Sequence, residues 1–107
     1  MNIIIAGGGR VGYHLAQLLA VEHHSLTVIE KDPNRLELID QAIDASTING
    51  NVISVFLLKE AGAETADLFV SVTGQDEVNL LAAAAAKGLG AKQVVARVDE
   101  MNKWNKW

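Results

Sequence analysis

Short apolar runs alternate with amphipathic stretches along most of the chain. The runs are rich in Ile, Val and Leu, which is typical of strands that are buried on both faces of a sheet. The predicted strands cover residues 3–6, 26–29, 47–49, 68–72 and 94–98, the third being short and weak. Between them, apolar residues recur every three or four positions, and this spacing predicts helices.

Signals at the segment ends support these helices. Asp32 is predicted to cap the second helix, with Pro33 in its first turn. The third helix is expected over 52–62, and the fourth runs from residues 75–77, which place acidic groups at its start, to the glycines at 88–90. The apolar positions of the first two helices are Val11, Leu15, Leu18 and Leu19, followed by Leu36, Ile39 and Ile43.

Strands that alternate with helices imply right-handed crossovers and a parallel sheet. We therefore expect an α/β fold, a doubly wound Rossmann-type sheet with strand order 3-2-1-4-5. The 107 residues suffice for a single domain with one core. We expect that domain over residues 1–98. Residues 102–107 repeat Asn-Lys-Trp and fit no element, and residues 99–107 are interpreted as an irregular or artificial tail.

A glycine-rich turn joins the first predicted strand to the first helix. Gly7, Gly9 and Gly12 form the pattern GxGxxG. The first glycine permits a sharp turn, the second leaves the backbone bare for a diphosphate, and the third lets the helix pack closely. The amides and dipole at the helix start favour an anion. The alternative is a tight turn without a ligand.

An acidic residue, Glu30, ends the second predicted strand, about 20 residues beyond the glycine turn as the dinucleotide-binding pattern requires. A carboxylate here accepts hydrogen bonds from both ribose hydroxyls of an adenosine. It also repels a 2′-phosphate, which disfavours NADP. The alternative is a solvated strand end.

Three further residues are candidates for the same site. Arg10 lies inside the glycine turn, where its guanidinium could reach a phosphate, or else be solvated. Thr73 and Gly74 follow the fourth strand, where the crossovers change direction and where ligands collect in open α/β sheets. An ordinary turn with a helix cap is the alternative for this pair.

Composition excludes several classes of function. The formal net charge of −4 argues against a nucleic-acid surface, and the absence of cysteine excludes a disulfide framework and a thiolate metal site. The three histidines lack metal-ligand spacing, and no residues form a recognisable catalytic set. There is neither a signal peptide nor an apolar run long enough to span a bilayer. We expect a soluble, cytoplasmic protein that is not an enzyme.

Four segments together resemble one family. They are residues 7–12 (Gly-Gly-Gly-Arg-Val-Gly), 28–33 (Val-Ile-Glu-Lys-Asp-Pro), 58–62 with Ala66-Asp67, and 72–79, which contain Thr-Gly-x-Asp-Glu-x-Asn. The chain is similar over residues 1–98 to the RCK domains, also called TrkA N-terminal or potassium-transport nucleotide-binding domains. The last segment is more characteristic of this family than the glycine turn, which many dehydrogenases share.

The resemblance implies a regulatory domain or subunit that binds NAD(H) or ATP/ADP and assembles as a homo-oligomer, a dimer or ring, beneath a membrane-embedded potassium channel or transporter. It would lie in the cytoplasm, at the inner face of the membrane through its partner. The implied contacts are Gly7, Gly8, Gly9, Arg10 and Val11 at the phosphates, Glu30 at the ribose, Asn51 near the adenine, Thr73 and Gly74 along the pocket, and Arg97 at the end of the fifth strand. Gly12 and Lys31 complete the implied cofactor-binding set. The family commonly has another polar residue at the position of Asn51, and it continues beyond Val98 through further elements.

Two other functions stay open at this point. The chain could be the cofactor-binding portion of an NAD-dependent dehydrogenase whose catalytic domain is missing. It could also be a stand-alone nucleotide-binding subunit with a different partner. A ligand sensor needs no catalytic groups, which agrees with their absence from this sequence. Glu30 cannot distinguish NAD(H) from ATP/ADP, because both ligands present the same ribose.

Overall fold

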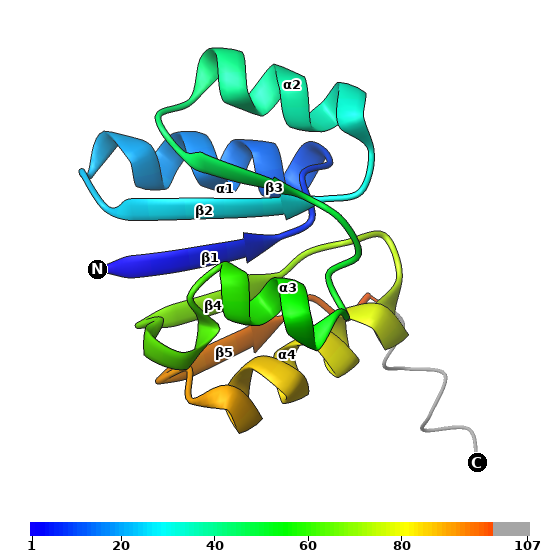
Figure 1. Cartoon of the computed structure of the whole chain (residues 1–107). Coiled ribbons are helices and arrows are strands. Elements are labelled where there is room, and N and C mark those ends of the chain that lie inside the picture. Colours follow the sequence, from blue (N-terminus) through cyan, green and yellow to red (C-terminus); the bar gives the residue numbers. More distant parts are fainter. Residues whose placement is uncertain (100–107) are drawn as a thin grey trace.

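The computed structural model describes residues 1–99, which form a parallel sheet and its connecting helices (Figure 1). The strand order β3-β2-β1-β4-β5 confirms the predicted topology. The central strand β1 pairs with β2 on one side and with β4 on the other. The strands are β1 (Asn2–Ala6), β2 (Ser25–Glu30), β3 (Ser46–Asn49), β4 (Leu68–Ser71) and β5 (Gln93–Ala96).

Helices cover both faces of this sheet (Figure 1). The side chains of a strand alternate between faces, so neighbouring residues of β1 enter different layers. Ile3 and Ile5 pack in one layer with α1 and α2, whereas Ile4 packs in the other with α3 and α4. The helices are α1 (Arg10–Val21), α2 (Pro33–Ala42), α3 (Val55–Glu60) and α4 (Asp76–Leu89), with a 3-10 turn η1 (Ala63–Thr65) before β4.

Two helix boundaries differ from the sequence prediction. The third helix begins at Val55 rather than at Val52, because Ser54 caps it by accepting a hydrogen bond from the backbone N–H of Leu57 (3.3 Å). Val52 is buried in the preceding turn. Ile43 is buried as expected, but it follows the end of α2 instead of belonging to it.

The first helix approaches the sheet on small residues. Gly12 and Ala16 are its buried positions, whereas Leu18, predicted on the apolar face, is 69% exposed and Val11 is 38% exposed. Leu15 and Leu19, however, are half-buried and pack against the core as expected. The apolar spacing therefore predicted the helix correctly and part of the face on which it packs. Large side chains would hold the helix farther from the strands than glycine and alanine do.

The fifth strand ends earlier than predicted. Arg97 and Val98 follow β5 instead of extending it, although the backbone N–H of Arg97 still donates to the carbonyl of Ser71 (2.9 Å). Asp99 is the last described residue. The rest of the tail predicted for 99–107 lies outside the described residues, so that prediction is untested.

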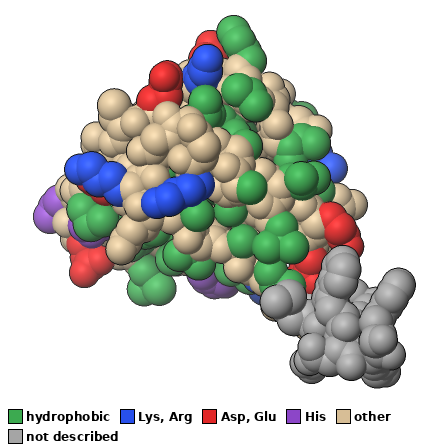
Figure 2. Space-filling view, turned by 90° about the horizontal axis from the view of Figure 1, so that it is seen from below, with side chains coloured by type: hydrophobic (Ala, Val, Ile, Leu, Met, Phe, Trp, Pro, Cys, Tyr) green, Lys and Arg blue, Asp and Glu red, His purple; other side chains and the backbone are tan. Residues whose placement is uncertain are grey.

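Apolar side chains are exposed on the side where α4 and β5 lie (Figure 2). Leu80 and Leu81 of α4 are 45% and 59% exposed, and Val95 of β5 is 53% exposed. Within residues 1–99, no helix has the length and apolar character to cross a membrane.

Candidate functional site

A cavity of about 640 Å³ opens at the carboxyl ends of the strands, at the edge toward which the arrows point in Figure 1. Its wall comprises the β1–α1 turn, the end of β2, the β3–α3 turn, the β4–α4 turn and the residue after β5. The helices that follow β1 and β4 leave to opposite faces of the sheet. The cavity therefore lies at the switch point, where open α/β sheets bind their ligands.

Most of the residues predicted for the site line this cavity. They are Gly7, Gly9, Arg10, Val11, Glu30, Lys31, Asn51, Thr73, Gly74 and Arg97. Gly8 and Gly12 do not: Gly8 faces a shallower hollow of about 270 Å³ between α1 and α2, and Gly12 lies beneath the turn. Sequence reasoning missed Arg35, Gly50, Val52, Ile53, Val72, Gln75 and Val78, which also line the cavity.

Gly7 and Gly12 are required by the fold itself. Gly7 has a φ of +113°, which L side chains rarely adopt, and a Cβ there would lie 3.0 Å from the backbone N of Thr73. A Cβ at Gly12 would overlap the carbonyl oxygen of Gly7 and would lie 3.4 Å from a methyl group of Val72. These two glycines keep the turn, the start of α1 and the end of β4 in close contact.

Gly9 has a different explanation. Its φ of −74° and ψ of −160° suit any residue, and a Cβ there would meet only the guanidinium of Arg35, at 3.5 Å. Nothing in the described protein requires a glycine at this position. Gly9 lines the cavity, and a bare backbone at this position is what the turn of a diphosphate-binding motif requires.

The start of α1 is left open toward the same space. Its N-cap residue, Gly9, offers no side-chain oxygen, and the first turn contains no acidic residue. By contrast, Asp32 caps α2 by accepting from the N–H of Asn34 (2.9 Å), and Ser54 caps α3. The first backbone N–H groups of a helix have no partner within it. At α1 they are available to an anion, and the helix dipole adds to the attraction.

Glu30 is a buried carboxylate with two backbone partners. Glu30 is only 5% exposed. Its Oε1 accepts from the N–H of Gly8 (2.6 Å) and its Oε2 from the N–H of Asp32 (2.8 Å). It thus fastens the glycine turn to the end of β2. Each carboxylate oxygen has a further lone pair for a ligand hydroxyl. The ribose contact stays a prediction, and the hold on Gly8 is a second role that the sequence did not reveal.

Positive charge is concentrated around the cavity. Arg10, Lys31, Arg35 and Arg97 line it, whereas the chain as a whole has a net charge of −4 and only nine Lys and Arg residues. A concave site lined by one sign of charge focuses its field and attracts the opposite charge. The cavity therefore favours an anionic ligand although the protein is acidic.

Arg35 is the most informative residue that sequence reasoning missed. It belongs to the first turn of α2, its Nε lies 3.9 Å from Oδ2 of Asp32, and its guanidinium faces Gly9 across the cavity mouth. The only sequence signal was its spacing, three residues after a capping aspartate. That spacing is common on solvated helix faces. Only the packing of α2 beside the glycine turn places Arg35 at the cavity.

The turn after β4 is held by a fully buried asparagine. Asn79 Oδ1 accepts from the backbone N–H of Thr73 (2.8 Å) and from its hydroxyl (2.7 Å), and Asn79 Nδ2 donates to the carbonyls of Thr73 (3.1 Å) and Arg97 (3.0 Å). This one amide joins α4, the β4–α4 turn and the end of β5. The signal was a polar residue inside an apolar helical run, at the last position of Thr-Gly-x-Asp-Glu-x-Asn.

The β3–α3 turn forms the far wall of the cavity. Asn51 Oδ1 accepts from the backbone N–H of Ile53 (3.1 Å), which stabilises a tight turn, and both residues line the cavity. Ile53 is 41% exposed and Val52 is buried. The wall therefore combines apolar side chains with an amide, a composition suited to a planar base. The contact of Asn51 with an adenine stays a prediction.

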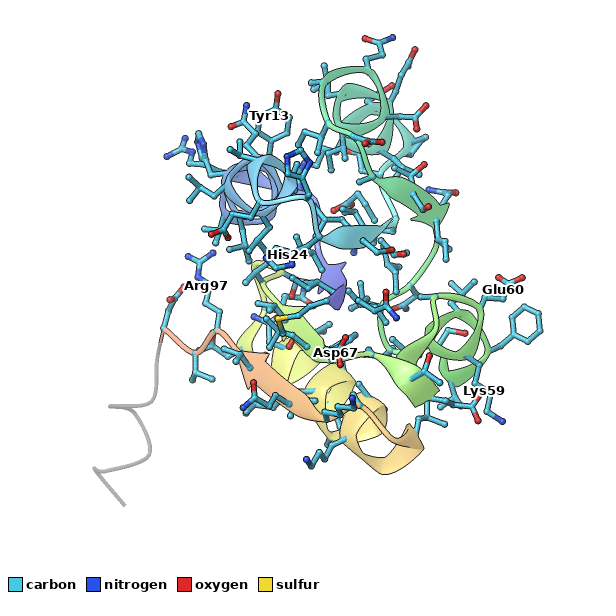
Figure 3. All side chains as sticks on the ribbon, turned by 90° about the vertical axis from the view of Figure 1, so that its left-hand side faces the viewer. Tyr13, His24, Lys59, Glu60, Asp67 and Arg97 are labelled. Carbon is cyan, nitrogen blue, oxygen red and sulfur yellow. The ribbon has the colours of Figure 1, made fainter. Side chains whose placement is uncertain are left out.

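Outside the cavity, a perturbed carboxyl lies at the opposite edge of the sheet (Figure 3). The backbone N–H of Asn2 donates to Asp67 Oδ2 (2.8 Å), and Lys92 Nζ lies 3.1 Å from Oδ1. This hydrogen bond, aided by the ammonium group, holds the pKa of Asp67 below its ordinary value of 3.8. Among residues 1–99, no cluster of three His, Cys, Asp or Glu could hold a metal ion.

Comparison with known sequences gives one family. The model of the TrkA-N domain matches residues 3–106. A Trk system potassium uptake protein TrkA homolog from Archaeoglobus fulgidus is 52% identical over 99 residues, which cover 92% of this chain and 22% of that protein. A TrkA homolog from Methanothermobacter thermautotrophicus is 39% identical over 98 residues, 92% of this chain and 45% of that protein. The chain thus spans less than half of the length of these curated relatives.

Solved structures share the same architecture. A Kef CTD from Shewanella denitrificans in AMP-bound form has a TM-score of 0.72 at 25% identity, over 87% of this chain and 55% of that chain. The anaerobillin reductase ChuY from Escherichia coli O157:H7 has a TM-score of 0.71 at 14% identity, over 98% of this chain and 55% of that chain. The second likeness concerns the fold alone, since one fold hosts both enzymes and binding modules.

Proposed function

This chain belongs to the TrkA-N domain family, and we propose that it is the nucleotide-binding regulatory domain of a potassium transport system. Its ligand is an adenine nucleotide, NAD(H) or ATP/ADP, with the diphosphate over the glycine turn. The observation that carries the proposal is Gly9, whose missing side chain leaves space in the cavity that no packing of the protein explains.

Phosphate binding rests on three features that meet at one place. The bare backbone of Gly9 lets phosphate oxygens approach closely, the uncapped start of α1 offers backbone donors, and Arg10 and Arg35 supply positive charge. Each feature alone is common in proteins. Together they match a doubly charged group that lies against the turn.

The adenosine is assigned to the side of β2 and β3. Glu30 would accept hydrogen bonds from its ribose, and Lys31 lies beside it. Asn51 and Ile53 would contact the base at the far wall. The AMP-bound form of the similar Kef CTD supports an adenine nucleotide here.

A regulatory role needs no catalytic acid or base at the cavity. The described wall contains no His, Cys or Tyr, and its single carboxylate, Glu30, is buried and already held by two amides. Hydride transfer needs an acid or base within reach of the reacting carbonyl. The alternative, a dehydrogenase cofactor domain, would need a second domain to supply that group.

The names of the relatives supply the partner in this proposal. They are potassium uptake proteins, so the ligand-bound domain would act on a membrane-embedded channel or transporter from the cytoplasmic side. We further propose that it does so as a homo-oligomer, in which ligand binding alters the contacts between subunits.

Three glycine variants test the site. Gly9→Val should abolish binding of NADH and ADP in isothermal titration while the circular dichroism stays that of the wild type, because the fold leaves room for a side chain there. Gly12→Val should prevent folding, since its Cβ would overlap the turn. Gly88→Val, on α4 with nothing within 4 Å, is the matched control and should bind normally. Normal binding by Gly9→Val would refute the proposal.

Turnover separates the sensor from the enzyme. The intact protein that contains this domain, reconstituted in vesicles with its potassium transport partner, should show nucleotide-dependent potassium flux and no net reduction of NAD with hydroxy acids, alcohols or aldehydes. Steady production of NADH from any of them would favour the dehydrogenase.

A further inference from the structure

Arg97 reaches the cavity while its guanidinium is paired with the next acidic residue of the chain. Its Nε donates to Oδ1 of Asp99 (3.1 Å), and Nη2 lies 2.9 Å from Oδ2. This is a two-point pair, in which the planar guanidinium fork meets both oxygens of one carboxylate. Figure 3 shows Arg97 at the end of β5, where the ribbon leaves the sheet.

The two partners are anchored to different degrees. The backbone of Arg97 is fixed on both sides, because its N–H donates to the carbonyl of Ser71 (2.9 Å) and its carbonyl accepts from Asn79 Nδ2 (3.0 Å). Asp99 is held by its pair with Arg97 and by a hydrogen bond from its N–H to Asp76 Oδ1 (3.1 Å). If the ion pair opens, the arginine side chain stays over the cavity and Asp99 loses one of these two attachments.

The position of Arg97 relative to the glycine turn determines which ligands reach it. Along the open edge, the strand ends follow in the order β2, β1, β4 and β5, so Glu30, the glycine turn, Thr73 and Arg97 succeed one another. Two strand spacings, about 10 Å, separate the ends of β1 and β5. With adenosine beside Glu30 and the first phosphates over the turn, only a ligand that continues beyond them approaches Arg97.

We propose that Asp99 is an internal competitor for Arg97, which the terminal phosphate of an extended nucleotide displaces. The inference rests on the proposed adenine-nucleotide site and adds to it a discrimination by length and charge. A terminal phosphate presents the same two-oxygen geometry as the carboxylate with more negative charge. ATP therefore opens the pair, and AMP leaves it closed.

The exposure of the pair makes this exchange feasible. The side chains of Arg97 and Asp99 are 37% and 57% exposed, and ion pairs at such positions contribute little to stability. A bound phosphate can therefore replace the carboxylate at small cost. The exchange also couples the cavity to the segment after β5, because the ligand that captures Arg97 detaches Asp99 from it. The coupling is reciprocal, so a contact that withdraws Asp99 would strengthen the binding of ATP.

The test compares ATP with AMP by isothermal titration of the whole chain. Asp99→Asn removes the competing charge and should tighten ATP binding by about three- to tenfold. This range combines the effect of an exposed ion pair with the loss of a repelling carboxylate. The affinity for AMP should stay unchanged. Glu77→Gln is the matched control: it removes one negative charge from the first turn of α4, and no ion pair joins Glu77 to Arg97 in the described residues. It should alter neither affinity. Arg97→Gln should reduce the affinity for ATP and make it insensitive to Asp99→Asn.

A second readout follows the pair directly. The Nε–H resonance of Arg97 in nitrogen-15 spectra should shift when ATP is added and stay in place when AMP is added. An unchanged ratio of ATP to AMP affinity in Asp99→Asn, or equal tightening for both nucleotides, would overturn the inference while leaving the site intact. If the wild type binds no adenine nucleotide, the proposed function fails and the inference falls with it.

Discussion

Replacing Asn79 by alanine removes the one side chain that joins three parts of the site. The residue is fully buried and makes four hydrogen bonds, two as acceptor from Thr73 and two as donor to the carbonyls of Thr73 and Arg97. Alanine keeps α4 helical, since it has the best helix propensity. The change therefore tests the hydrogen bonds and not the helix.

The expected loss of stability follows from these four bonds. A neutral hydrogen bond contributes about 0.5–1.5 kcal/mol net, which would give about 2–6 kcal/mol if the four were additive. Thr73 is half-buried, so water can replace some of the hydrogen bonds that its groups lose. Replacement at the carbonyl of Arg97 depends on whether the end of β5 keeps its position. We expect the free energy of unfolding to fall by about 3 kcal/mol. For a domain of this size, that corresponds to a decrease in Tm of about 12–24 °C.

Urea unfolding followed by circular dichroism measures this change. Ser71→Ala removes a single buried bond, from the Ser71 hydroxyl to the carbonyl of Asn79 (2.6 Å), and should cost about 1 kcal/mol. Gln41→Ala removes an exposed contact to Glu37 and should stay within about 0.5 kcal/mol of the wild type. If Asn79→Ala lowers the free energy of unfolding by less than about 1 kcal/mol, with the m value in urea unchanged, the β4–α4 turn does not need this amide.

Two further changes probe the opposite edges of the sheet. Glu30→Ala should weaken NADH or ADP binding by about 1.5–3 kcal/mol, the range for hydrogen bonds to a charged group. It should also destabilise the fold, because the amides of Gly8 and Asp32 lose their acceptor. Unchanged affinity in calorimetry would show that Glu30 does not contact the nucleotide. The pKa of Asp67 is lowered in the folded state, so its carboxylate stabilises the protein at pH values above its ordinary pKa of 3.8. This contribution disappears as the pH falls through the lowered pKa. Asp67→Asn should accordingly be less stable than the wild type in urea at neutral pH and equal to it in strong acid, and a difference that persists in acid would contradict the assignment.

The three glycines of the motif show how one sequence pattern contains separate requirements. Gly7 and Gly12 are fixed by the protein's own packing, through a positive φ and a contact that a Cβ would obstruct. Gly9 is fixed by neither, and its bare backbone has meaning only for a ligand. The spacing GxGxxG would be the same whether a glycine serves the packing of the protein or the approach of a ligand. The sequence could therefore suggest these roles but could not verify them.

Local patterns and chain connectivity were sufficient for the architecture. The apolar runs located the five strands, the cap at Asp32 located the start of α2, and the alternation of strands and helices predicted the order that the sheet has. Right-handed crossovers leave few arrangements for such a chain, so the topology follows from the succession of elements. The carboxyl ends of β1 and β4 then meet at a switch point, which placed the glycine turn and Thr73 beside one cavity.

The partners of polar groups were decided only by the tertiary structure. Nothing near Glu30 in the sequence indicates that the amide of Gly8 occupies one of its oxygens, and nothing near Asn79 indicates the carbonyl of Arg97. Arg35 became part of the cavity because α2 packs beside the glycine turn. Periodicity records whether a residue is buried, since burial repeats with the turn of a helix or the pleat of a strand. A hydrogen bond between distant residues has no such period, and it depends on which strand ends the folded sheet brings together.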